Sequence, residues 1–202
     1  MAAVTTVARV CNLALGLVGQ RQFIDNLTEN STEAQVCAVY YESTRNELLQ
    51  AWHWRFATKR AVLALTTETR TGWGYCYAAP ADMLTPRRIW DGQREPGAGE
   101  AIPFGWELND AASGHLVLTD MEQAELIYTA EFTNVALWPP LFVKAVAAQL
   151  AVYLAGALPV KPELMPTLQR NATLALQTAA AHDANAATRD TEADSEIIRE
   201  RG

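Results

Sequence analysis

The run AWHWRFATKRA, from Ala51 to Ala61, is the feature that most constrains how this chain can fold. It places three large aromatic residues, Trp52, Trp54 and Phe56, close together; we call these three residues the aromatic hub. Each aromatic side chain buries about 150–250 Å², so a cluster this dense must be covered by other parts of the chain. A helical pattern precedes it and an alternating pattern follows, which predicts that helices and strands both pack on the hub. We interpret Trp52 and Phe56 as core residues, with the alternative that one ring serves a subunit interface.

The size and charge of the chain exclude several classes of protein. The chain has 202 residues, half of them hydrophobic, which suits one globular domain or one domain with an insertion. Its formal net charge of -7 makes it a poor candidate for holding nucleic acid, because that affinity depends on Lys and Arg at the phosphates. The charge does not exclude a position next to DNA that involves no tight binding to it.

The cysteines and the apolar segments indicate a reducing compartment and a globular core. Cys11, Cys37 and Cys76 are odd in number, lack CxxC spacing and lie in apolar contexts, so we expect buried free thiols. The first residues lack the basic and apolar regions of a signal peptide. The most apolar segment, Leu141 to Leu158, contains Lys144 and is rich in Ala, so we expect a buried core helix there.

Two helices are predicted before the hub. Apolar residues at helical spacing predict a first helix capped by Thr5 or Thr6 and ended near Gly16. Asn30 followed by Glu33 resembles a capping box and predicts the start of a long second helix. That helix carries its apolar residues at four-residue spacing and delivers the chain to the hub: Val36, Tyr40, Thr44, Leu48 and Ala51.

Residues 61–132 read as strands. Alternation predicts one apolar strand face made of Ile102, Phe104, Trp106 and Leu108, and Pro103 favours an edge position for that strand. Short connections favour antiparallel neighbours, hence a small meander or sandwich. The segment 91–101 is rich in turn residues and is expected to form an exposed loop.

Helical patterns return after Pro139-Pro140. Ala147, Ala151 and Ala155 form a ridge of small residues that lets another helix approach the first of these helices closely. A last helix follows Pro162, and its apolar stripe weakens to methyl groups before residue 188.

These patterns predict an α+β fold: mainly a helical bundle of about four helices, with an antiparallel β insertion between helices 2 and 3 and an extended C-terminal tail. The predicted domains are a helical core (1–60 and 133–187), the β insertion (61–132) and a docking tail (188–202).

The tail, residues 188–202, is not expected to become ordered in the isolated chain. Fixing fifteen residues costs about 15–30 kcal/mol of backbone entropy, whereas burying Ile197 and Ile198 returns about 3–6 kcal/mol. We therefore expect contacts outside its own fold to order it, with continuation of the last helix as the alternative.

The sequence carries no recognisable catalytic or metal-binding motif. His53, His115 and His182 lie far apart and none has zinc-ligand spacing. Asp82 and Asp91 both lie in turns, where Asp is common for backbone reasons. We predict that the protein is not an enzyme and has no cofactor or metal.

A basic patch follows the hub at Arg55, Lys59 and Arg60. It is interpreted as pairing with the chain's own acids, with a contact to DNA or an acidic partner as the alternative.

Several stretches together resemble the head-to-tail adaptor proteins of tailed bacteriophages, of the podophage tail tubular protein A type. The resemblance covers about residues 9–155, and its most specific part is AWHWRFATKRAVLA at the hub. The other matching stretches are NLALGLVGQR from Asn12, Tyr40-Tyr41 with Arg45, WGYCYAAPAD from Trp73, LTD from Leu118 with Tyr128, and LFVKAVAAQLA from Leu141.

The resemblance implies a structural role in the virion neck. Such adaptors form a ring of about twelve copies beneath the portal, join it to the tail nozzle or tail tube, and extend the channel through which DNA leaves. A net acidic subunit around that channel would repel phosphate and let DNA pass without specific binding. The alternatives are a tail completion (terminator) ring protein, or a phage enzyme with an unrecognised site on the β insertion. No membrane is implied.

Two sets of residues are assigned to partners on exposure and composition. The tail is expected to dock on the portal through Asp194, Ile197, Ile198, Arg199 and Arg201. The loop is expected to face the next tail component through Arg94, Glu95 and Pro96.

Overall fold

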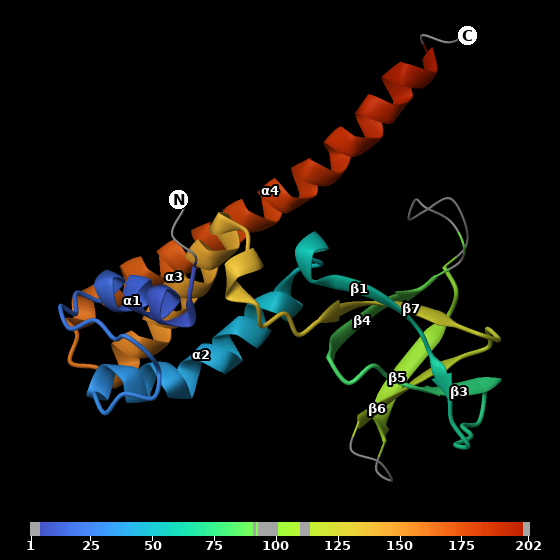
Figure 1. The fold of residues 1–202 in the computed structure, drawn as a ribbon, viewed down its shortest axis with the longest axis horizontal. Coiled ribbons are helices and arrows are strands. Elements are labelled where there is room, and N and C mark those ends of the chain that lie inside the picture. The colour runs from blue at the N-terminus through green and yellow to red at the C-terminus, as the bar shows by residue number, and fades with distance from the viewer. Residues whose placement is uncertain (1–4, 91, 93–100, 110–113, 200–202) are drawn as a thin grey trace. The chain divides into compact units, whose positions relative to one another are not determined.

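The computed structural model describes residues 5–90, 92, 101–109 and 114–199, with side chains described as far as residue 186. The chain divides into two compact units (Figure 1). We call Met1–Phe56 with Thr133–Gly202 the helical unit and Ala57–Phe132 the β unit. The predicted domain boundary after residue 60 therefore falls within the first strand of the β unit.

The helical unit is built around one central helix. Its helices are α1 (Val7–Leu17), α2 (Thr32–Ala51), α3 (Pro140–Ala157) and α4 (Met165–Arg199). Helix α3 contacts each of the other three helices. Half of α3 is buried, as predicted for a core helix. Among the helices of the described residues, α3 alone has the length and apolar composition of a membrane span, a property that buried core helices share.

The helix starts follow local capping chemistry. Thr6 has an extended backbone, and its side chain accepts a 3.2 Å hydrogen bond from the Arg9 N–H, which confirms the predicted first cap. The second helix is capped by Ser31, whose side chain accepts from Ala34 N–H at 3.2 Å, and not by Asn30. The prediction was wrong by one residue because both types cap well and spacing alone does not choose between neighbours.

The described residues of the β unit form seven strands in two antiparallel sheets. The strands are β1 (Thr58–Val62), β2 (Ala64–Leu65), β3 (Tyr75–Ala78), β4 (Met83–Ile89), β5 (Phe104–Asn109), β6 (Gly114–Thr119) and β7 (Glu125–Ala130). One sheet has the order β1-β7-β4 and the other β2-β3-β6-β5. Strands far apart in sequence therefore pair, which excludes a simple meander, whereas two antiparallel sheets that share a buried cluster fit the predicted alternative of a small sandwich.

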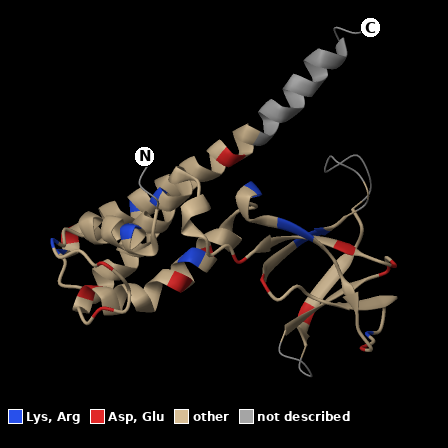
Figure 2. Ribbon diagram, in the orientation of Figure 1, with Lys and Arg blue, Asp and Glu red and all other residues tan. Residues whose placement is uncertain are grey.

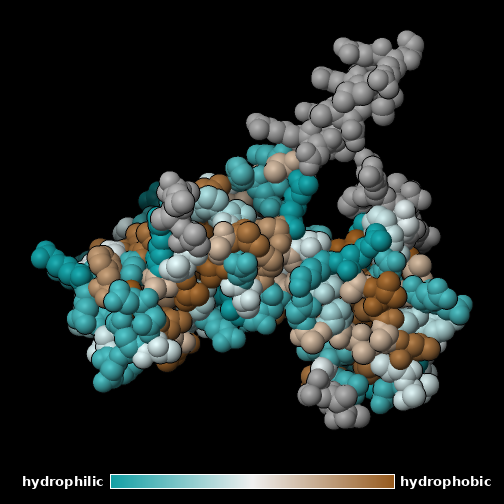
Figure 3. Space-filling view, viewed as in Figure 1, coloured by the Kyte–Doolittle hydropathy of each residue, from teal (hydrophilic) through white to brown (hydrophobic). Residues whose placement is uncertain are grey.

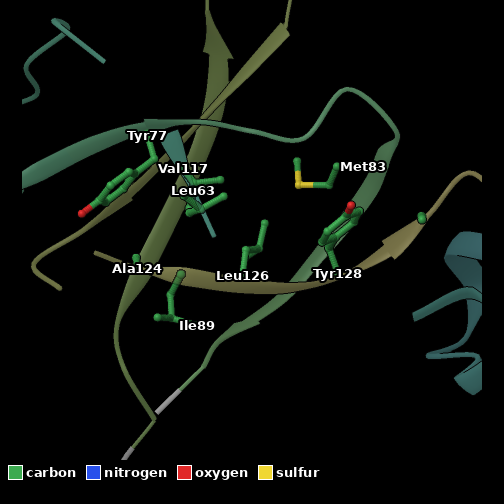
Figure 4. Close-up of a cluster of buried hydrophobic side chains, with 9 residues drawn as sticks. Leu63, Tyr77, Met83, Ile89, Val117, Ala124, Leu126 and Tyr128 are labelled. Atoms are coloured by element: carbon green, nitrogen blue, oxygen red, sulfur yellow. The ribbon is translucent and has the colours of Figure 1, made fainter. Parts of the chain in front are cut away.

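The core of the β unit lies on one face of β7, the middle strand of its sheet. Leu126 is fully buried and pairs with Ala61 on β1 and Ile89 on β4. Side chains from both sheets surround it, as Figure 4 shows. The buried cluster consists of Leu63, Tyr77, Met83, Ile89, Val117, Ala124, Leu126, Tyr128 and Ala130.

The apolar face predicted on the strand after residue 101 is only partly buried. Phe104 is half-buried, whereas Trp106 and Leu108 are 47% and 62% exposed. The reason is topological: β5 is an edge strand, so its side chains have a neighbouring strand on one side only. Pro103 directly precedes this edge strand, in keeping with its predicted effect.

The predicted fold class is wrong. The described residues form four helices and two antiparallel sheets with seven strands, so the chain is not mainly a helical bundle. The strands make a compact unit with its own core. The C-terminal segment is not an extended tail either, because α4 continues to Arg199. Its Ala and Glu residues favour a helix even where the apolar stripe has ended.

The three cysteines confirm the prediction of buried free thiols. Cys11 on α1 and Cys37 on α2 are completely buried, and Cys76 lies in the β unit. The hydrogen bond with Cys37 and burial both raise the pKa of the Cys11 thiol, so this thiol stays protonated at neutral pH.

Candidate interaction surfaces

Trp54 is the buried centre of the aromatic hub. Its ring centroid lies 5.0 Å from that of Phe142 in a T-shaped arrangement and 5.9 Å from that of Phe56. The indole N–H donates a 2.7 Å hydrogen bond to the carbonyl of Leu48. This carbonyl lies in the last turn of α2, where backbone acceptors have no partner within the helix. Trp54 therefore fills the core and also completes the end of α2.

The hub joins two ends of the helical unit. Phe142, near the start of α3, lies 4.9 Å from Phe56 and 5.1 Å from Trp138 between ring centroids. These three rings and that of Trp54 all belong to the helical unit. The hub thus fixes where α2 ends relative to where α3 begins.

Trp52 was predicted to be a core residue, and this prediction is wrong because 40% of its surface is exposed. The helix ends at Ala51 and Trp52 has an extended backbone, with φ −143° and ψ 160°. The helical spacing that turns Leu48 inward no longer applies at this position. The alternative that one hub ring serves a subunit interface stays a prediction for Trp52.

The residues assigned to partners lie largely outside what the structure describes. The loop residues fall outside the described residues: Arg94, Glu95 and Pro96. The tail residues on α4 have a described backbone only: Asp194, Ile197, Ile198 and Arg199. Arg201 is outside the described residues. Both assignments remain predictions.

Lys59 and Arg60 pair with acids of the β unit, as the interpretation of the basic patch expected. Lys59 Nζ lies 2.6 Å from Asp82 Oδ2, and Arg60 Nε lies 2.7 Å from Glu125 Oε2. The Arg60 guanidinium also lies 4.6 Å from the ring centroid of Trp90, and Figure 2 shows basic positions along β1. These contacts place both cations in ion pairs on the surface of the sheet, and the alternative of a contact to DNA or an acidic partner stays a prediction.

Asp82 is held in a small polar cluster with Lys59 and Tyr128. Although partial burial opposes it, hydrogen bonds from Lys59 and the Tyr128 hydroxyl hold the pKa of Asp82 below its ordinary value of 3.8. Burial, together with the bond to Asp82, raises the pKa of Tyr128 to about 12. No group of three or more His, Cys, Asp or Glu within the described residues is arranged to hold a metal ion.

We expect Asp82→Asn to lower the free energy of unfolding by about 1–2 kcal/mol at pH 7, because one charged acceptor and its ion pair are lost. Since the folded pKa of Asp82 is depressed, its contribution is complete above the unfolded pKa and is lost as the pH falls through the folded one. Urea unfolding from pH 7 to pH 3 should therefore show the two proteins converging in acid. A difference that stays constant with pH would contradict the role of the charge.

An apolar groove opens on the helical unit between α1, α3 and α4, with a volume of about 440 Å³. Leu13 and Leu17 of α1 form one wall and Leu174 of α4 the other; these leucines are 44%, 45% and 59% exposed. Ala147 and Ala148 of α3 contribute to the floor. Figure 3 shows apolar residues reaching the surface of this unit among hydrophilic ones.

One cation stands in this apolar setting. Lys144 of α3 lines the groove and is exposed, and it is the one Lys or Arg among the described residues that line it. The polar lining residues besides it are Asn171 and Thr178 of α4. The groove is therefore suited to an apolar surface that carries a carboxylate.

The apolar surface extends past α1 toward the connector before α2. Asn12 holds this connector by two 2.8 Å hydrogen bonds, one to the carbonyl and one from the N–H of Ile24. Ile24 is buried, while its neighbour Phe23 is 59% exposed beside Leu13. The wall of the groove and Phe23 thus share one side of α1.

Sequence reasoning missed the groove, although a signal for it was present. Leu13 and Leu17 are spaced by four residues and lie outside the buried stripe of α1. Leu174 likewise lies outside the buried positions Leu168 and Ala172 of α4. Apolar residues on two sides of an amphipathic helix indicate a second surface to be covered.

Helix α2 carries a second exposed surface on another side of the helical unit. Ala38, Val39 and Ser43 are small exposed residues, and Val39 is 69% exposed. Glu42 lies among them with 73% of its side chain exposed, at 3.6 Å from Arg45. We call these residues the outer face of α2.

Comparison with known proteins assigns no family to the chain: no protein-family model matches it, and the search of curated proteins gave no significant match.

Proposed function

We propose that the chain is a structural protein of a bacteriophage virion and not an enzyme. In this proposal it is an adaptor subunit that forms a ring of about twelve copies, joins the portal to the tail nozzle or tail tube, and lines the channel through which DNA leaves. The virion neck is its location, and assembly occurs in the host cytoplasm.

The apolar groove of the helical unit is the observation that carries the proposal. Soluble monomers rarely leave contiguous apolar surface uncovered, and such surface beside polar residues marks an interface. Leu13, Leu17, Phe23 and Leu174 are large apolar side chains exposed in or beside the groove. An assembly subunit accounts for this exposure, because neighbouring subunits cover it.

The resemblance to adaptors supplies the kind of assembly. The stretch that carries it most specifically contains Trp54 and Phe56, which tie α2 to α3 in the unit that bears the groove. Docking of residues 188–202 on the portal and of the 91–101 loop on the next tail component are parts of the same proposal.

Light scattering of the purified chain, alone and mixed with the portal protein of the same genome, tests the proposal. We expect a shift from a small species to a portal-bound ring, and deletion of residues 188–202 should abolish portal binding. A small free oligomer that ignores the portal would contradict the adaptor function and favour a tail completion ring. Unchanged binding after the deletion would reject the tail assignment alone.

A further inference from the structure

We propose that the groove between α1, α3 and α4 receives the outer face of α2 from a second copy of this chain, with Glu42 of one copy against Lys144 of the other. The inference rests on the proposed function in that a ring brings copies head to tail, and it names the two surfaces that meet.

The charges of the two surfaces are complementary. Lys144 is the one cation among the described residues that line the groove, and Glu42, although 3.6 Å from Arg45, is exposed between apolar and small residues of α2. Glu47, further along α2, is less available because it accepts hydrogen bonds from Tyr153 at 2.7 Å and Gln149 at 3.4 Å. An ion pair inside an apolar contact would fix the register of the two copies.

The shapes of the two surfaces also match. Ala38, Val39 and Ser43 form a low ridge on α2. Ala147 and Ala148 give the groove a shallow floor between its leucine walls. Small residues on both sides let two helices approach to the 8–10 Å interaxial distances that close packing needs.

The groove and helix α2 lie on different sides of α3, so that one copy can use both surfaces at once. Leu141, Lys144 and Ala148 face the groove, whereas Tyr153 faces α2, where it stacks on Tyr40 at 5.8 Å. Ala148 and Tyr153 are five residues apart, which at about 100° per residue puts them roughly 140° apart around α3. A copy that offers its α2 to one neighbour therefore keeps its own groove open for another, so the contact is heterologous.

Disulfide trapping between two single-cysteine variants of the full chain tests the contact without the portal. Val39→Cys on one chain and Leu17→Cys on the other should crosslink under mild oxidation, and the native cysteines are buried, so the background is low. The matched control replaces Leu17→Cys by Leu65→Cys, which is 63% exposed on the β unit. Crosslinking no faster than in this control would overturn the proposal.

Charge reversal identifies the ion pair. Adding Lys144→Glu to the Leu17→Cys chain should slow crosslinking about tenfold or more, because Glu42 then meets a like charge. Adding Glu42→Lys to the Val39→Cys chain as well should restore the rate. Glu122→Lys, an exposed acid on the β unit, is the matched control for the second change and should restore nothing. Equal rates in all four mixtures would overturn the proposal.

The outcomes separate this inference from the proposed function. Charge-dependent crosslinking without any ring on the portal would retain the contact and contradict the adaptor function. A portal-bound ring that forms equally well from Glu42→Lys and Lys144→Glu chains, each used alone, would retain the adaptor function and overturn the contact.

Discussion

Replacing Trp54 by alanine should lower the free energy of unfolding by about 3–5 kcal/mol, the usual cost of truncating a buried aromatic residue. The loss has two sources in the structure. The change removes ring contacts with Phe142 and Phe56, and it leaves the carbonyl of Leu48 without the indole N–H that it accepts from at 2.7 Å. Since a typical domain has about 5–15 kcal/mol of stability, the variant should be marginal at 37 °C.

Urea unfolding followed by far-UV circular dichroism measures this effect without relying on tryptophan fluorescence. Trp52→Ala is the matched control, because it removes the same side chain two residues away at a position that is 40% exposed. We expect the control to lose about 1 kcal/mol or less. Similar losses for the two variants would show that Trp54 is not the buried anchor of the hub.

The hub illustrates how far the sequence alone leads. Its density predicted burial, and Trp54 is buried, whereas Phe56, which was predicted to be a core residue, is only half-buried beside the Trp54 ring. The sequence could not indicate that Trp52 would turn outward, because this depends on the residue at which α2 ends. Successive residues of a helix point about 100° apart around its axis, so a helix that ends one residue earlier or later changes where the following side chain points.

The strands show a different limit. Alternation along a strand predicts which residues share a face but does not identify the partner strand. Thr58 of β1 pairs with Thr129 of β7, more than half the β unit away in sequence. This long-range pairing could not be predicted from the short connections between strands. The alternating residues of β5 were predicted to share one apolar face, and Trp106 and Leu108 on that face are exposed because β5 is an edge strand. Pro86 within β4 gave no strand signal, although an edge strand with register shifts tolerates it.

The candidate site was the least predictable part. The groove depends on three helices that meet around α3, and its walls come from residues about 160 positions apart in sequence, Leu13 and Leu174. Helical periodicity identified the stripe that each helix buries in its own unit. It carried no information about which remaining apolar residues would be brought together at the surface.

Replacing Leu126 by alanine should destabilise the β unit by about 2–5 kcal/mol, the range for a buried leucine in a core that relaxes only partly. Leu126 is fully buried on β7, the middle strand of its sheet, and belongs to the cluster that both sheets share. A cavity at this position weakens contacts from both sheets at once. We therefore expect the loss to appear throughout the β unit rather than in one strand.

Hydrogen exchange on the full chain locates the effect, because amides report the free energy of the opening that exposes them. Each unit has a core of its own, so Leu126→Ala should reduce protection by about a hundredfold between residues 57 and 132 and leave α1 and α3 nearly unchanged. Leu65→Ala, on an exposed strand position, is the matched control and should change little. Equal loss of protection in α3 and β7 would mean that the two units unfold as one cooperative structure, and the groove could then not be treated as a property of the helical unit alone.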